Sequence, residues 1–130
     1  MKSGDYIAAT ADELAANTTS DKVAGGVSQK ALFRRRGEVE FDGRTLTLRG
    51  WSDGRDLQLG SGDVTAVRRE FTDLYGRFIG GLLDKGKPLI LETATEGEIY
   101  LLIDRKEFME TTDNKSWEKE LTAWSGQSNP

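Results

Sequence analysis

The sequence predicts a mainly β fold of the α+β class: a seven-stranded, partly open antiparallel barrel closed by a C-terminal helix. Three observations lead to this prediction. From residue 30 onward, apolar and polar residues alternate with the period of two that is typical of half-buried strands. Asp-Gly pairs, which favour hairpin turns, separate several of these segments. After residue 104 the apolar residues change to helical spacing.

The predicted strands follow one another as a meander, which must curl or close to protect its edges. Gly37 marks a bend or a break between the first two strands, and the Asp-Gly pairs at 42–43 and 53–54 predict tight turns. Segments 89–91 and 99–103 are almost continuously apolar, so the last two strands should be covered on both faces. The predicted strands are residues 31–36, 38–42, 44–49, a segment in which Leu57 and Leu59 alternate, and residues 63–69, 88–93 and 98–103.

Residues 1–29 contain few large apolar groups, and we expect them to form a loosely attached N-terminal arm. Within this arm, Thr10 and Glu13 have the spacing of a capping box, which would begin a short helix. The domain proper is then residues 30–124, followed by a polar tail at 125–130.

The closing helix is predicted from both its start and its apolar face. Asp104 and Glu107 are suited to cap it, and Trp117, Leu121 and Trp124 recur at i, i+4 and i+7. The tryptophans of the chain could line a pocket, but tryptophans at this spacing more often pack in a core.

Composition excludes several kinds of chemistry. The 130 residues include no Cys and no His, which excludes disulfides, thiolate metal sites, a Cys nucleophile and a His general base. We expect no metal and no cofactor. The net charge of −4 argues against nucleic-acid binding. The N-terminus lacks the apolar core of a signal peptide, and no stretch approaches the roughly 20 apolar residues of a membrane span, so we expect a soluble cytoplasmic protein.

Seven strands followed by an amphipathic helix is also the element order of the pleckstrin-homology-like (PH-like) superfamily. The sequence resembles that superfamily, in particular its GRAM and bacterial PH branches, over about residues 30–124. The positions that resemble the phrases of those branches are Asp63 to Val67, Pro88 to Thr93, Gly97, Tyr100, Arg105 and Phe108. The resemblance implies a PH-like fold and a binding module rather than an enzyme.

Positive charge is concentrated in residues 30–69, which carry nine Lys or Arg against six acids. In PH domains that bind phosphoinositides, basic residues of the first strands hold the headgroup, and Arg can donate two hydrogen bonds to a phosphate at once. More commonly, such residues form a solvated, salt-bridged strand face, on which Glu38 and Glu40 would neutralise the arginines. The residues of this candidate lipid or anion site are Lys30, Arg34, Arg35 and Arg36, with Arg68 and Arg69 as neighbours.

Residues 71–83 carry an apolar stripe at helical spacing, which predicts a short helical insert between strands five and six. Such a segment plugs the open end of the barrel, which is the more common outcome, or it is displayed as an interaction surface. The stripe consists of Phe71, Leu74, Tyr75, Phe78, Ile79, Leu82 and Leu83.

We therefore expect a non-enzymatic binding or scaffolding module that engages a protein partner or a second copy of itself. Binding of an anionic lipid or phosphate headgroup is the alternative. A small enzyme comes third. One cluster of carboxylates has no recognisable acid–base spacing, so no catalytic residue is assigned. It consists of Asp63, Glu70 and Asp73.

Overall fold

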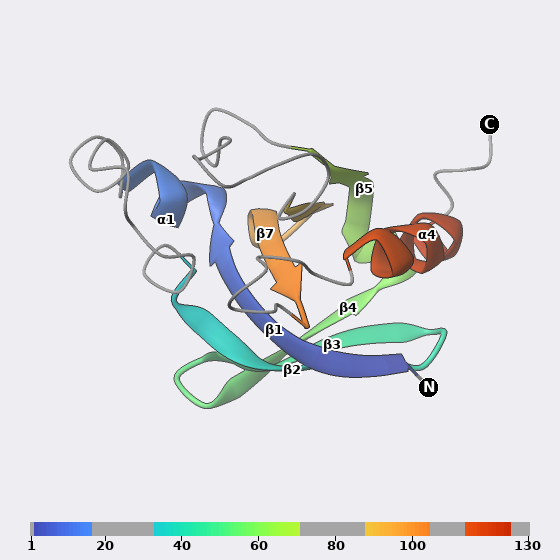
Figure 1. Ribbon diagram of the computed structural model, residues 1–130, viewed down its shortest axis with the longest axis horizontal. Helices are drawn as coiled ribbons and strands as arrows, with labels where there is room; N and C mark the ends of the chain where they lie inside the picture. The colour runs from blue at the N-terminus through green and yellow to red at the C-terminus, as the bar shows by residue number, and fades with distance from the viewer. Residues whose placement is uncertain (1, 17–32, 71–87, 105–113, 126–130) are drawn as a thin grey trace.

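The computed structural model describes residues 2–16, 33–70, 88–104 and 114–125 (Figure 1). The elements in chain order are β1 (Lys2–Thr10), α1 (Ala11–Ala16), β2 (Arg35–Phe41), β3 (Thr45–Ser52), β4 (Arg55–Gly60), the 3-10 helix η1 (Ser61–Asp63), β5 (Val64–Arg69), β6 (Leu89–Thr93), β7 (Gly97–Ile103) and α4 (Asn114–Ser125).

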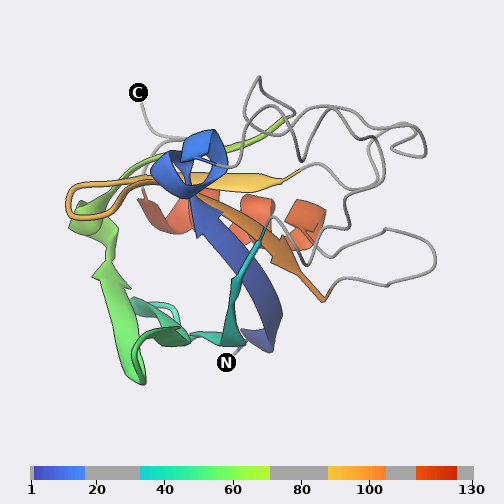
Figure 2. The ribbon, with the colours of Figure 1, turned by 90° about the vertical axis from the view of Figure 1, so that its left-hand side faces the viewer.

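The described strands form one antiparallel sheet in the order β4-β3-β2-β1-β7-β6-β5. The sheet curls into a half-barrel, and α4 packs against its β5 side (Figures 1 and 2). β4 and β5 are neighbours in the chain but lie at opposite ends of this order, joined by η1 alone. The prediction of a mainly β, seven-stranded curled sheet with a C-terminal helix is confirmed.

The expected loose N-terminal arm is wrong for residues 2–16. β1 lies in the middle of the sheet, where Tyr6 is paired with Gly37 of β2 on one side and with Ile103 of β7 on the other. The inward positions Tyr6 and Ala8 are 2% and 0% exposed. Because β1 fills its inner face partly with alanine, its sequence lacks the bulky alternation that indicates a strand.

A second correction concerns the first two predicted strands, 31–36 and 38–42. They are one strand, β2, which begins at Arg35 and continues through Gly37. A Cβ at Gly37 would lie 2.0 Å from the carbonyl oxygen of Arg49, so glycine permits β2 and β3 to approach closely here. Two predicted strands thus become one, but β1 adds a strand that was not predicted, so the predicted number of seven was still right.

The predicted tight turns and the predicted capping box are confirmed. Asp53 and Gly54 have φ of 48° and 78°, the two positive values of a type I′ hairpin turn. The Thr10 amide donates to Glu13 Oε1 at 2.9 Å, and the Glu13 amide donates to Thr10 Oγ1 at 3.2 Å. This reciprocal pair begins α1 directly where β1 ends.

The sheet is buried on both faces near β6 and β7, as their apolar sequence predicted. Leu91 and Leu101 belong to the inner core, and Ile90 and Tyr100 belong to a smaller outer core. Leu14 of α1 covers that outer core. The inner core includes the following buried residues of β1, β2, β3, β7 and α4: Tyr6, Val39, Leu46, Leu48, Trp51, Ile103, Trp117 and Leu121.

The closing helix packs by the face that the sequence predicted. Trp117 and Leu121 are 1% and 0% exposed, and Trp124 meets Phe41 edge to face with ring centroids 5.2 Å apart. These tryptophans are core groups. Asp104, the predicted cap of this helix, has φ of 52° and accepts from the Asp5 amide at 2.9 Å through its Oδ1. Glu107 and the predicted helical insert over residues 71–83 lie outside the described residues.

Candidate functional site

The predicted anion site is only partly described. Lys30 lies outside the described residues, and Arg34 and Arg36 are exposed around the start of β2. Arg35 is different, because its guanidinium Nε forms an ion pair with Glu13 Oε1 at 3.0 Å and the side chain is 23% exposed. Three consecutive arginines therefore do not form one exposed surface.

Arg35 is held in place by two further contacts, both with Trp51. Its guanidinium lies 4.4 Å from the ring centroid of Trp51 and donates to the Trp51 carbonyl oxygen at 2.7 Å. Trp51 Nε1 in turn donates to Glu96 Oε1 at 3.3 Å. Partial burial raises the pKa of Glu13, but hydrogen bonds from Arg35 and the Thr10 backbone outweigh it, so the net shift is downward. Arg35 thus joins α1 to β3.

Arg68 and Arg69 do not lie beside the basic residues of β2. They are on β5, and β1, β7 and β6 separate the two strands in the sheet. Arg69 Nε lies 3.2 Å from Glu118 of α4, and its side chain is 13% exposed. The six sequence-predicted basic residues are therefore not brought together as far as the structure describes them.

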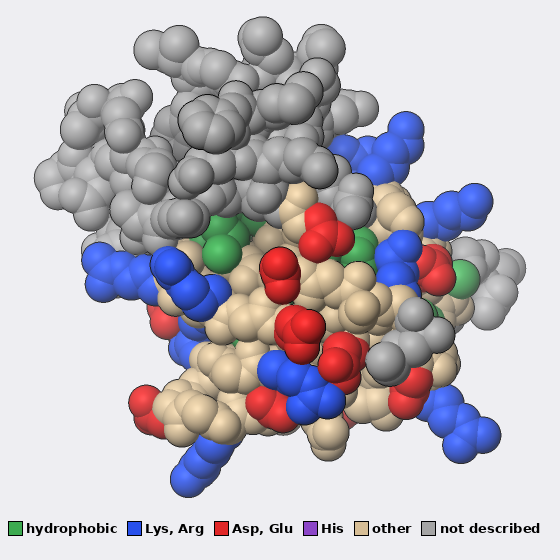
Figure 3. Space-filling model, turned by 60° about the horizontal axis from the view of Figure 1, so that its bottom comes forward, with side chains coloured by type: hydrophobic (Ala, Val, Ile, Leu, Met, Phe, Trp, Pro, Cys, Tyr) green, Lys and Arg blue, Asp and Glu red, His purple; other side chains and the backbone are tan. Residues whose placement is uncertain are grey.

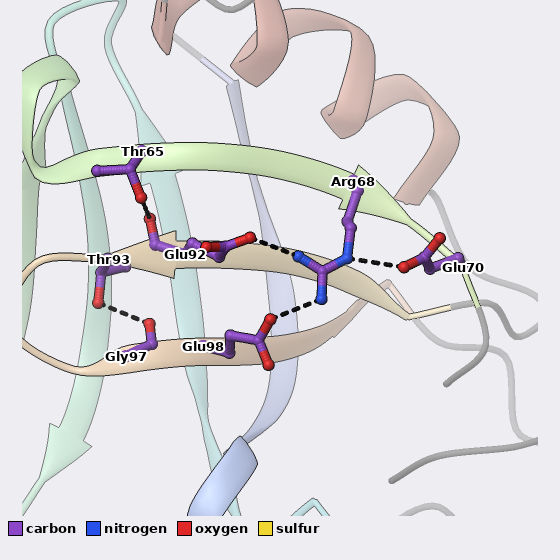
Figure 4. Close-up of polar contacts among 7 residues, drawn as sticks. All are labelled: Thr65, Arg68, Glu70, Glu92, Thr93, Gly97 and Glu98. Atoms are coloured by element: carbon purple, nitrogen blue, oxygen red, sulfur yellow. Dashed lines mark hydrogen bonds and ion pairs between the residues drawn. The ribbon is translucent and has the colours of Figure 1, made fainter. Parts of the chain in front are cut away.

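Arg68 is surrounded by carboxylates (Figure 4). Its three guanidinium nitrogens lie 2.8, 2.7 and 2.6 Å from oxygens of Glu70, Glu92 and Glu98. The hydrogen bond to Glu98 is the largest cause that raises the pKa of Arg68. Three carboxylates share one cation, so an added phosphate would have to displace them against their charge.

Acidic side chains gather on the outer face of β1 to β3, where red groups cross the middle of Figure 3. Asp5 and Glu38 are directly paired positions on β1 and β2, and like charges so placed repel each other. Arg49 of β3 is paired with two acids, at 2.7 Å from Glu40 and 3.1 Å from Asp56. Its hydrogen bond lowers the pKa of Glu40. This face is unfavourable for an anionic surface.

The carboxylates considered for catalysis have structural partners where they are described. Asp63 accepts a hydrogen bond from the Gly60 amide at 2.8 Å, and Glu70 is paired with Arg68. Asp73 lies outside the described residues. Both described carboxylates therefore already have a hydrogen-bond or ion-pair partner within their own chain.

One described surface depression has a volume of about 450 Å³. It lies between the N-terminal end of β1, the β2–β3 turn and α4, and it is open to solvent. Lys2 in its wall is paired with Glu120 at 2.8 Å. The depression therefore offers no unpaired lysine to a ligand. Its lining residues are Lys2, Phe41, Asp42, Gly43 and Glu120.

The two edges of the described sheet differ. α4 packs along β5, where the Arg69–Glu118 pair joins helix to strand. Among the described elements, β4 packs mainly against β3 and η1 (lower left of Figure 2). Arg55, Asp56 and Gln58 of β4 are exposed. An open strand edge presents unpaired backbone groups, which can accept another strand.

The sequence-predicted interaction stripe, from Phe71 to Leu83, lies outside the described residues. Sequence reasoning missed β4 as a candidate, because an edge is defined by which strands pair and not by composition. The Asp-Gly turn before β4 was the available signal, since it determines which β4 residues face β3.

No protein-family model matches the chain, and no curated protein matches it. Among the described residues, no helix is long and apolar enough to cross a membrane. Within the same part of the chain, no three acidic side chains are grouped so that they could hold a metal ion. What the chain binds is therefore inferred from its own geometry.

Proposed function

We propose that the chain is a PH-like, non-enzymatic interaction module that binds a protein partner by adding a strand at β4. The PH-like assignment is supported by the seven-stranded curled meander and by the helix that follows the last strand. The binding role is supported above all by one observation: α4 packs against β5, whereas among the described elements β4 packs mainly against β3 and η1.

The backbone of β4 supplies the binding groups. A partner in extended conformation gains main-chain hydrogen bonds along the edge, and its alternate side chains give specificity. Leu57 is half-buried against the inner core, so an apolar side chain of the partner beside it would extend that core. The preferred partner segment alternates apolar and polar residues.

The described arginines support lipid-headgroup binding less well. Arg35, Arg68 and Arg69 already have carboxylate partners within 3.2 Å. The outer face of β1 to β3 is acidic, which repels an anionic membrane. An open strand edge can bind a partner without first displacing a carboxylate.

A peptide selection tests the proposal. The Gly60 amide donates to Asp63 and so points away from β3, and since amides alternate along a strand, the Gln58 amide points outward as well. Random peptides displayed on phage are selected against the wild-type chain and counter-selected against Gln58→Pro, which removes this edge amide. Proline is tolerated where an edge N–H faces solvent, so this variant should keep its fold, as judged by its thermal unfolding. Gln58→Thr retains the amide and serves as the matched control.

We expect peptides that bind the wild type and Gln58→Thr but not Gln58→Pro. In the complex the amides of Asp56 and Gln58 should exchange with solvent more slowly than in the free chain. Peptides that bind Gln58→Pro equally well, or that leave both amides unprotected, would count against strand addition at β4.

A further inference from the structure

The two Asp-Gly pairs of the chain are chemically matched but lie in different surroundings. Arg follows both pairs, so Asp42-Gly43-Arg44 and Asp53-Gly54-Arg55 are the same three residues. Aspartate before glycine is prone to close a succinimide ring, because glycine has no side chain to hinder its amide nitrogen. We infer that Asp53, and not Asp42, is a site of spontaneous isomerisation to isoaspartate in the folded chain.

The reaction consists of two steps, in which one water leaves and one is added. First the Gly54 nitrogen attacks Cγ of the Asp53 carboxyl group; a bond forms between these two atoms, and the carboxyl OH leaves with the amide proton as water. Water then adds to the main-chain carbonyl carbon of Asp53 and breaks its bond to the Gly54 nitrogen. The main chain now passes through Cβ and Cγ, and the former main-chain carbonyl is a free carboxylate.

Asp53 and Gly54 form the exposed tip of their hairpin. Ser52 and Arg55 are the paired residues that flank this type I′ turn, so the hydrogen bonds of the hairpin lie outside the two tip residues. Neither tip residue forms a hydrogen bond or an ion pair with another described residue. The Asp53 carboxyl group can therefore rotate toward the Gly54 nitrogen without breaking a side-chain contact.

Asp42 is held by its own loop. Its Oδ1 accepts hydrogen bonds from the Arg44 and Thr45 amides, each at 2.8 Å. These bonds hold the carboxylate at the amides beyond Gly43, so attack by the Gly43 nitrogen requires that both be broken. The bonds from Thr45 and Arg44 also lower the pKa of Asp42, which reduces the share of the protonated carboxyl from which water can leave.

Helix α4 fixes the same loop from outside. Trp124 Nε1 donates to the Arg44 carbonyl oxygen at 3.1 Å, and the Trp124 ring packs against Phe41. Space does not distinguish the two pairs, because no atom lies within 4 Å of the Cβ position of either Gly43 or Gly54. The difference therefore comes from the hydrogen bonds that hold the 42–44 loop.

Isomerisation would change the start of β4. It adds one methylene group to the main chain at Asp53, whereas a type I′ turn needs two ordinary residues with positive φ. The hydrogen bonds between Ser52 and Arg55 should therefore open, and the Arg55 amide should exchange faster with solvent. The reaction goes beyond strand addition at β4 and does not depend on it.

Ageing of the full chain at neutral pH in heavy-oxygen water tests the inference. Hydrolysis of each succinimide adds one heavy oxygen atom, so mass spectrometry of the digested chain measures the reaction at each pair separately. We expect label and isoaspartate at Asp53, and roughly tenfold less at Asp42, because two hydrogen bonds to a charged group must break there first.

The same chain unfolded in guanidinium chloride is the internal control, in which both pairs should react at similar rates. Asp53→Glu keeps the charge but requires a larger ring that closes far more slowly. This variant should lose the label at the turn and keep its Arg55 amide protected after ageing. Equal labelling of Asp42 and Asp53 in the folded chain, or labelling of neither while the unfolded chain reacts, would overturn the inference.

Discussion

At the scale of single residues, Gly37 leaves less room for a Cβ than any other glycine that the structure describes. We expect Gly37→Ala to lower the free energy of unfolding by about 3 kcal/mol, because its Cβ would lie 2.0 Å from the Arg49 carbonyl oxygen and β2 would have to move. Gly62→Ala is the control, since no atom lies within 4 Å of its Cβ position. Urea unfolding of both variants measures the difference, and equal stabilities would contradict the expectation.

Tyr6 makes the stability sensitive to alkaline pH. Its hydroxyl donates to the Arg49 carbonyl oxygen at 2.8 Å, and burial raises its pKa from 10.0 to about 12. The folded state therefore favours the protonated phenol. This contribution is complete below pH 10 and is lost as the pH rises through 12.

We expect the wild type to lose about 2 kcal/mol between pH 9 and 12 from this one group. Tyr6→Phe should be less stable at neutral pH by about 1 kcal/mol, the value of the lost hydrogen bond, but should show a smaller alkaline loss. Chemical unfolding at pH 8 and pH 11 compares the two chains. Parallel pH profiles would show that Tyr6 does not cause the loss.

At the scale of elements, Asn114 attaches α4 to the end of β7. Its Oδ1 accepts from the Ile103 amide at 2.9 Å, and its Nδ2 donates to the Leu101 carbonyl oxygen at 2.9 Å. Asn114 is 1% exposed. Its side chain takes the place of a peptide group of a neighbouring strand. β6 begins at Leu89, and the Asn114 side chain thus continues the pairing of β7 beyond that residue.

Asn114→Ala should cost about 3 kcal/mol, because it leaves a buried donor and a buried acceptor without their partner. Hydrogen exchange should also accelerate at the Ile103 amide more than at amides in the middle of β7. Lys115→Ala changes an exposed neighbour on the same helix and should be close to neutral. An unchanged exchange rate at Ile103 would be inconsistent with this role.

At the scale of the whole molecule, β1 joins the two halves of the sheet. β2, β3 and β4 lie on one side of it, and β7, β6 and β5 lie on the other. It is paired along its length, with seven partner positions in β2 and five in β7. Its removal would open two ladders and expose both cores.

A chain that lacks residues 1–16 should therefore show no cooperative unfolding transition in circular dichroism. A synthetic peptide of residues 1–16 should restore a cooperative transition when added in excess, because it replaces the missing strand. A scrambled peptide of the same composition is the control. Cooperative unfolding of the shortened chain by itself would indicate that β1 is dispensable.

The order of the strands also explains why the β4 edge is better suited to binding than the arginines. Arg35 of β2 is distant in the sheet from Arg68 and Arg69 of β5, and all three are paired with carboxylates, whereas the β4 edge needs only backbone groups to bind. The sequence alone could not predict this, because strand pairing between distant segments selects the edges.

Much of the fold was predictable because it is local. Alternation at Leu46 and Leu48, the Asp53-Gly54 turn and the Thr10–Glu13 capping box each depend on neighbours within a few residues. The tryptophan face of α4 was visible for the same reason. Such patterns specify where an element begins, where it ends and which side is buried.

What only the tertiary structure decided is non-local. β1 is a strand because β2 and β7 flank it, although its small residues hardly indicate one. Arg35 is paired with Glu13 rather than with the predicted Glu38 or Glu40, because α1 returns to the start of β2. The sequence by itself determined a mainly β chain with a closing helix; contacts between distant residues determined its centre, its edges and the partners of its charges.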